Sequence, residues 1–213
     1  MRRFIIKKPR QVIDRKTLKA KLEDLVNRSG YNSKTQAEVL GLYKQAFRSG
    51  WDQVRQRFEN GEIGGPETIY LHAYLMDQVI RLIHEFAINY VYPTNNPTMG
   101  EQMSVLATGG YGRKELAPFS DVDLMFLLPY KLTPHSEQVV EYTLYSLWDL
   151  GLKVGHATRS IDETIYLAGQ DLTIRTSLID ARCLWGNQGL FKEFQTRFYN
   201  ELVVGKGTKF VEG

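Results

Sequence analysis

The feature that most constrains this sequence is the stretch Met103–Leu128, in which a pair of glycines separates two apolar segments. Its pattern predicts a short strand, a turn at Gly109 and Gly110 that opens a helical turn, and a second strand carrying Asp121 and Asp123. Side chains alternate along a strand, so both carboxylates are expected to point into one small volume. Like charges there need a cation, whereas the glycines and the free N–H groups of the helical turn favour an anion. The stretch therefore predicts a site for metal-bound phosphate.

Length and composition predict a globular protein with a substantial core. The chain has 213 residues, of which 43% are hydrophobic, so one domain, or one domain with a helical appendage, is expected. Its apolar runs are shorter than the roughly 20 residues of a membrane span. The single Cys183 cannot form an internal disulfide and suggests no zinc site. We therefore expect a cytoplasmic protein without a membrane partner.

The positive charge is concentrated at the N-terminus. Residues 1–35 hold 11 Lys and Arg against 3 Asp and Glu, although the whole chain has a formal charge of only +3. Such an arm could contact nucleic acid, a nucleotide or an acidic protein, but a solvated, poorly ordered tail is the commoner explanation of such a run. We do not expect a nucleic acid partner.

Hydrophobic periodicity predicts an α+β fold: a small mixed sheet flanked by helices, with a helical N-terminal region. Ser33 and Thr35 both have the spacing of a capping box before a long helix, and Pro66 suits the first turn of a second one. Helices are also expected over 14–27, 134–150, 161–168 and around 191–199, and a third strand over 152–158, whereas 177–184 could be helix or strand. The predicted division is a basic arm (1–32), a helical region packing on the catalytic domain (33–98), a core (99–204) and a polar tail or linker start (205–213).

Two common phosphate-binding motifs are absent. Gly110 and Gly112 begin a dinucleotide-type pattern, but its third glycine position holds Glu115, and no P-loop motif occurs anywhere. Arg113 and Lys114 follow the glycines and are well placed to neutralise a triphosphate, although surface charges on a short helix explain them equally well.

The residues from Gly109 to Leu124, GGYGRKELAPFSDVDL, resemble the motif of the DNA polymerase β nucleotidyltransferase superfamily, and specifically of bacterial PII uridylyltransferases. Later blocks, Leu147–Arg159 and Asp171–Arg182, are similar to further blocks of the same family. Together these blocks extend over roughly residues 66–200, and their ordered agreement is more specific than any one motif.

The resemblance implies transfer of a uridylyl group from UTP to a tyrosine hydroxyl of the signalling protein PII, with release of pyrophosphate. It implies Mg²⁺ as cofactor, held by Asp121 and Asp123. The superfamily usually has a third carboxylate, for which Asp180 is the candidate, although a salt bridge with Arg182 or another base is an equally good interpretation. The residues implied to bind the nucleotide are Gly109, Gly110, Arg113, Lys114 and Ser120.

Longer family members also carry a phosphohydrolase domain with an adjacent His-Asp pair and small-molecule-sensing domains. The sequence has no His-Asp dipeptide, so uridylyl-removing activity is not expected of it. Two alternatives stay open: a nucleotidyltransferase that uses another nucleotide or acceptor, and a nucleotide-binding module without catalysis.

Overall fold

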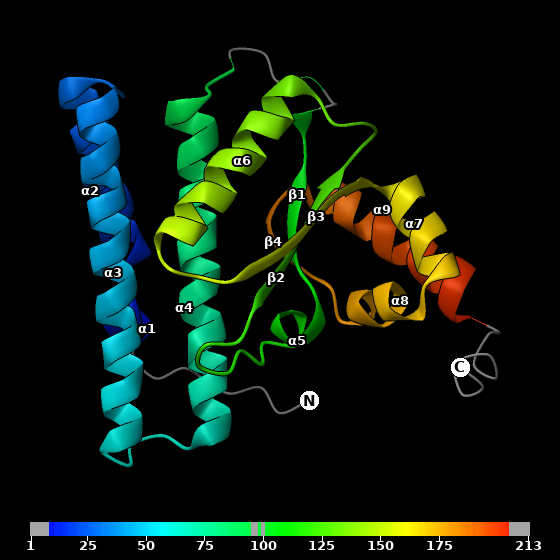
Figure 1. The fold of residues 1–213 in the computed structure, drawn as a ribbon, viewed down its shortest axis with the longest axis horizontal. Coiled ribbons are helices and arrows are strands. Elements are labelled where there is room, and N and C mark those ends of the chain that lie inside the picture. Colours follow the sequence, from blue (N-terminus) through cyan, green and yellow to red (C-terminus); the bar gives the residue numbers. More distant parts are fainter. Residues whose placement is uncertain (1–8, 95–97, 99–100, 205–213) are drawn as a thin grey trace. The chain divides into compact units, whose positions relative to one another are not determined.

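The computed structural model describes residues 9–94, 98 and 101–204, which form two compact units (Figure 1). Of the described residues, the first unit comprises 9–94, 114–122 and 139–154, and the second comprises 98, 101–113, 123–138 and 155–204. The chain thus passes between the units several times, whereas the sequence suggested consecutive segments. The predicted tail at 205–213 lies outside the described residues.

The first unit is helical. Its helices are α1 (Pro9–Val12), α2 (Arg15–Ser29), α3 (Ser33–Glu59), α4 (Gly65–Phe86), the π-helical turn η1 (Ala87–Val91) and most of α6 (Pro134–Asp149). The long helices α3 and α4 are connected by a glycine-containing turn and pack against each other, as predicted. No helix in the described part of the chain is long and apolar enough to cross a membrane.

Two details of the N-terminal region follow from its hydrogen bonds. Asn32 caps α3: its side chain accepts hydrogen bonds from the N–H groups of Lys34 and Thr35. A capping box is present, but the prediction that it starts at Ser33 or Thr35 was wrong. Asn32, the residue before them, supplies the acceptor side chain. In the basic region, Arg15 and Lys19 of α2 pair with Glu85 of α4 at 3.0 and 2.6 Å, so this part is a packed helix rather than a solvated tail.

The second unit contains the sheet, whose strands follow the order β3-β2-β1-β4. Its elements are β1 (Ser104–Ala107), α5 (Gly109–Gly112), β2 (Val122–Leu128), β3 (Val154–Ser160), α7 (Ile161–Gln170), α8 (Leu172–Ile179), β4 (Arg182–Gly186), α9 (Gln188–Phe198) and η3 (Tyr199–Val203). The first residue of β2 and of β3 is assigned to the first unit. β1 pairs antiparallel with both β2 and β4, which places Ala107 opposite Leu124 and Arg182.

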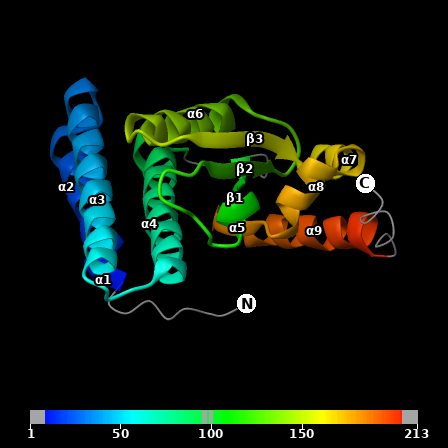
Figure 2. The same ribbon diagram turned by 60° about the horizontal axis from the view of Figure 1, so that its bottom comes forward.

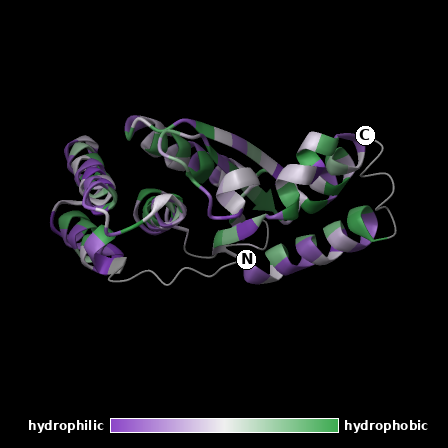
Figure 3. Cartoon of the chain, turned by 90° about the horizontal axis from the view of Figure 1, so that it is seen from below, coloured by the Kyte–Doolittle hydropathy of each residue, from purple (hydrophilic) through white to green (hydrophobic). Residues whose placement is uncertain are grey.

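Helices α7, α8 and α9 pack on this sheet through an apolar core (Figure 2). Leu106, Met125 and Leu127 of the sheet contact residues such as Ile165 and Phe194 of these helices. Hydrophobic and hydrophilic residues both appear on the helices in Figure 3, as expected for helices with one buried side. The α+β class with a small mixed sheet is therefore confirmed.

A buried histidine in the first unit predicts acid sensitivity. His84 has no exposed surface, and its Nδ1 lies 3.3 Å from Thr143 Oγ1. Burial lowers the pKa of His84 from 6.5 to about 3. The folded state therefore keeps His84 neutral while the unfolded chain binds a proton below about pH 6.5, so stability falls as the pH drops from 6.5 toward 3.

Between pH 7 and pH 5 this histidine should cost about 2 kcal/mol of the free energy of unfolding. We expect His84→Gln to remove that part of the pH dependence, measured by urea unfolding at the two pH values. Variant His156→Gln changes an exposed histidine and should keep the wild-type dependence. Equal pH dependence in wild type and His84→Gln would contradict the prediction.

Candidate active site at the paired-glycine turn

The paired-glycine turn lies against the start of β2. β1 ends at Ala107, and the N–H of Thr108 donates a hydrogen bond to the carbonyl oxygen of Asp123 at 3.1 Å. Gly109 follows with φ +56°, a conformation that favours glycine, and opens the single turn α5. The predicted strand, turn and second strand are thus confirmed. A backbone hydrogen bond joins the turn to Asp123, one of the two predicted metal ligands.

Two glycines provide the space that the Asp123 carboxylate occupies. A Cβ atom on Gly155 of β3 would lie 2.5 Å from Asp123 Oδ1, and one on Gly109 would lie 3.1 Å from Oδ2. Real Cβ atoms essentially never approach an oxygen as closely as 2.5 Å. The half-buried carboxylate therefore lies in space that a side chain on either glycine would narrow.

Asp121 and Ser120 precede β2. Asp121 is exposed, Val122 is 1% exposed and Asp123 is half-buried, which is the alternation expected of a strand that begins here. The N–H of Val122 donates to the carbonyl oxygen of Lys153 at 2.8 Å. The Ser120 hydroxyl donates to the carbonyl oxygen of Ala117 at 2.9 Å, so this side chain closes a turn.

Asp180, the candidate third acid, follows α8 in the second unit. Its Oδ2 lies 3.6 Å from Arg113 Nη1, and both side chains are about half exposed (46% and 44%). Its backbone oxygen lies so close to Gly112 that a Cβ there would be 2.5 Å away. Asp180 therefore belongs to the surroundings of α5, where its ionic partner is Arg113.

Comparisons with known proteins agree with the resemblance. Over 207 residues the chain is 52% identical to a bifunctional uridylyltransferase/uridylyl-removing enzyme of Rhodospirillum rubrum, a match covering 97% of this chain and 22% of that protein. Proteins of the same name match from Azospirillum brasilense (47% over 203 residues, 95% and 22%) and Caulobacter vibrioides (45% over 201 residues, 94% and 21%). The chain is homologous to one segment of these enzymes. It spans about a fifth of the length of the curated relatives it matches, and no family model matches it.

Lys114, one of the residues expected to bind phosphate, lies against Tyr70. Its Nζ lies 3.4 Å from the Tyr70 hydroxyl and 5.2 Å from the centroid of the Tyr70 ring, and both residues belong to the first unit. Of the two cations that follow the glycines, Arg113 is the one that the structure places in the same unit as Asp123.

The surroundings of α5 include two residues, Arg182 and Gly155, that the sequence did not identify as candidate site residues. Arg182 of β4 donates from Nε to the carbonyl oxygen of Gly112 and from Nη2 to that of Tyr111, both at 3.2 Å. Its guanidinium also lies 5.5 Å from the centroid of the Tyr111 ring. Arg182 thus connects β4 to α5. A glycine inside a strand often marks close approach of another group, which is the signal that could have identified Gly155.

The acidic residues of the candidate site could bind Mg²⁺ if oxygen atoms of a substrate completed its coordination. Within the described ranges, no three Asp, Glu, His or Cys side chains gather closely enough to hold a metal ion. Mg²⁺ commonly takes one or two carboxylates and completes its coordination with water and substrate phosphate oxygens. Carboxylate oxygens such as those of Asp123, which lie beside Gly109 and Gly155, are hard donor atoms that fit this description.

The Arg182 contacts predict a measurable stabilisation of α5. Replacing Arg182 with Met removes a charged donor from two backbone oxygens, and we expect the free energy of unfolding to fall by about 1–3 kcal/mol. Arg182→Lys should recover only part of the loss, because an ammonium lacks the planar fork that reaches both oxygens. Urea denaturation of the three proteins measures the effect. Indistinguishable unfolding midpoints would show that the two hydrogen bonds contribute nothing.

Proposed function

We propose that this chain catalyses Mg²⁺-dependent transfer of a uridylyl group from UTP to a tyrosine of PII, releasing pyrophosphate. The observation that carries the proposal is the Asp123 carboxylate held between Gly109 and Gly155 beside the paired-glycine turn. The 52% identity to a segment of a bifunctional uridylyltransferase/uridylyl-removing enzyme supports the choice of reaction. Removal of uridylyl groups is not part of the proposal.

In the proposed mechanism Gly109 and Gly110 admit the triphosphate, because neither carries a side chain that would fill the space next to Asp123. Asp121 and Asp123 hold the metal. Mg²⁺, when bound, stabilises the charge on the leaving pyrophosphate and helps the acceptor hydroxyl lose its proton. That help matters because a free tyrosine hydroxyl has a pKa of about 10.

Arg113 neutralises the triphosphate in this proposal. Its contact with Asp180 is long and half-exposed, so exchanging the carboxylate for a phosphate oxygen costs little. The exchange would release Asp180, the candidate third acid, next to α5. Lys114 would have to leave the Tyr70 ring to contribute, and Ser120 would have to leave Ala117.

Pyrophosphate release tests the proposal. Incubation of the chain with Mg²⁺, PII and either UTP, CTP or ATP should yield pyrophosphate with UTP and far less with the other two. Release with ATP or CTP instead would identify a nucleotidyltransferase with another substrate. Nucleotide binding without release of pyrophosphate from any of the three would identify a module without catalysis and refute the proposal.

A further inference from the structure

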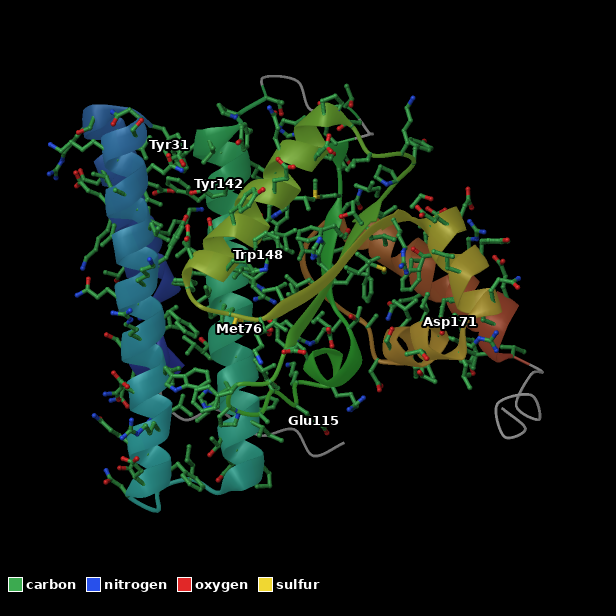
Figure 4. All side chains as sticks on the ribbon, viewed as in Figure 1. Tyr31, Met76, Glu115, Tyr142, Trp148 and Asp171 are labelled. Atoms are coloured by element: carbon green, nitrogen blue, oxygen red, sulfur yellow. The ribbon has the colours of Figure 1, made fainter. Side chains whose placement is uncertain are left out.

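The first unit contains a cavity lined mostly by residues that have no role in the proposed reaction. Its volume is about 600 Å³, within the roughly 300–1,000 Å³ of typical small-molecule sites. Helices α3 and α4, the segment 116–122 and the turn after α6 supply its lining, all from the first unit. Met76, labelled on α4 in Figure 4, belongs to this lining together with apolar residues such as Leu116 and Leu152.

Aromatic rings form one wall of the cavity. Phe47, Trp51 and Phe119 line it, and the Trp51 ring centroid lies 5.7 Å from that of Phe47 and 5.6 Å from that of Phe119. The Trp51 ring is also held against His72, at a centroid distance of 4.1 Å. A flat ring entering the cavity would therefore meet aromatic surface that is already fixed in place.

Phe119 combines a strained backbone with an exposed ring. Its backbone has φ +68°, in the left-handed region that favours glycine, and its side chain is 85% exposed. Such a conformation costs on the order of 1–3 kcal/mol and occurs preferentially at ligand clamps and active sites. A molecule in the cavity would bury the Phe119 ring. The strained backbone would then serve to hold this ring at the cavity for contact with the ligand.

The charged residues of the lining favour an anion. Of the described residues that line the cavity, Arg48 and Lys153 are cationic and Asp52 is anionic. The positive excess complements a carboxylate, sulfonate or phosphate on an otherwise apolar molecule. Arg48 adds a planar group that binds such oxygens with two hydrogen bonds.

The lining of the cavity includes neither Asp121 nor Asp123. Ser120 and Val122 line it and flank Asp121 in the sequence. Because side chains alternate along a strand, Val122 points to the face opposite that of Asp121 and Asp123. We propose that the cavity binds a small anionic ring compound, at a site distinct from that of the nucleotide.

The probe for the test is 8-anilinonaphthalene-1-sulfonate, an anionic ring compound whose fluorescence rises on binding. Titration of the wild-type chain should show one saturable site. Phe119→Gly relieves the backbone strain and so leaves the fold intact, yet it should weaken probe binding about tenfold through loss of the ring. Arg48→Gln should weaken binding about threefold through loss of the charge. Tyr166→Ala removes an exposed ring outside the cavity and should change nothing.

A competition experiment separates this site from the nucleotide site. Saturating Mg²⁺ and UTP should leave the affinity for the probe within about twofold, since the lining of the cavity includes neither Asp121 and Asp123 nor the paired glycines. Competitive displacement by UTP would overturn the proposal, because the cavity would then be part of the nucleotide site. Unchanged probe affinity in both Phe119→Gly and Arg48→Gln would overturn it as well. None of these outcomes depends on whether the chain transfers uridylyl groups.

Discussion

Replacing either Asp121 or Asp123 with Asn is expected to abolish uridylyl transfer while leaving the fold intact. Asparagine keeps the shape of the side chain but removes the negative charge that holds Mg²⁺. Loss of several kcal/mol of metal-mediated stabilisation lowers the rate by about three orders of magnitude. The rate of PII modification by each variant, measured at saturating UTP and Mg²⁺, gives the size of the effect.

The matched control is Asp162→Asn. Asp162 is 87% exposed and pairs with Arg197 on the surface of the second unit, so its replacement changes the net charge equally without touching the proposed site. It should transfer uridylyl groups at the wild-type rate. Wild-type activity in Asp121→Asn and Asp123→Asn would contradict the assignment of these residues as metal ligands.

Replacing Gly155 with Ala is expected to lower transfer by at least about a hundredfold, since displacement of a reacting group by about 1 Å has an effect of that size. The added methyl group would lie 2.5 Å from Asp123 Oδ1, so the carboxylate must move. The backbone of Gly155 does not lie in the left-handed region, so the effect of alanine at this position comes from its contact with Asp123. The Mg²⁺ concentration needed for half-maximal rate should rise, a change that general destabilisation would not produce.

Gly169→Ala serves as the control for this substitution. The added Cβ would meet Leu202 Cδ2 at 3.8 Å, an ordinary contact within the same unit, so neither rate nor Mg²⁺ dependence should change. If Gly155→Ala keeps both the wild-type rate and the wild-type Mg²⁺ dependence, the space beside Asp123 has no role in metal binding.

The parts of the fold that could be predicted from the sequence are those set by local patterns. Alternation and apolar runs identified the two strands around Gly109, and hydrophobic periodicity predicted helices over 14–27 and 161–168, where the structure has α2 and α7. The segment 177–184 stayed undecided because its apolar residues suit either state. The choice depends on pairing of β4 with β1, a contact between residues far apart in the sequence.

The residues of the candidate site are likewise of two kinds: some could be predicted from local sequence, and others depend on contacts between distant parts of the chain. Asp121, Asp123 and the paired glycines lie within one short stretch, so spacing alone could bring them together. The contact of Gly155 with Asp123 depends on the order of strands in the sheet, and the hydrogen bonds of Arg182 to α5 depend on the position of β4. Lys114 was expected near phosphate because of its charge, whereas the ring of Tyr70, 44 residues earlier, provides a contact that its sequence position does not reveal.

The mass of PII after incubation with this chain, Mg²⁺ and UTP tests the central claim most directly. We expect the mass of the PII subunit to increase by one uridylyl group, the modified residue to be a tyrosine, and the increase to disappear when Mg²⁺ is chelated or Asp121→Asn is used. Unmodified PII after incubation with the wild-type chain, under conditions in which a full-length uridylyltransferase modifies it, would contradict the account.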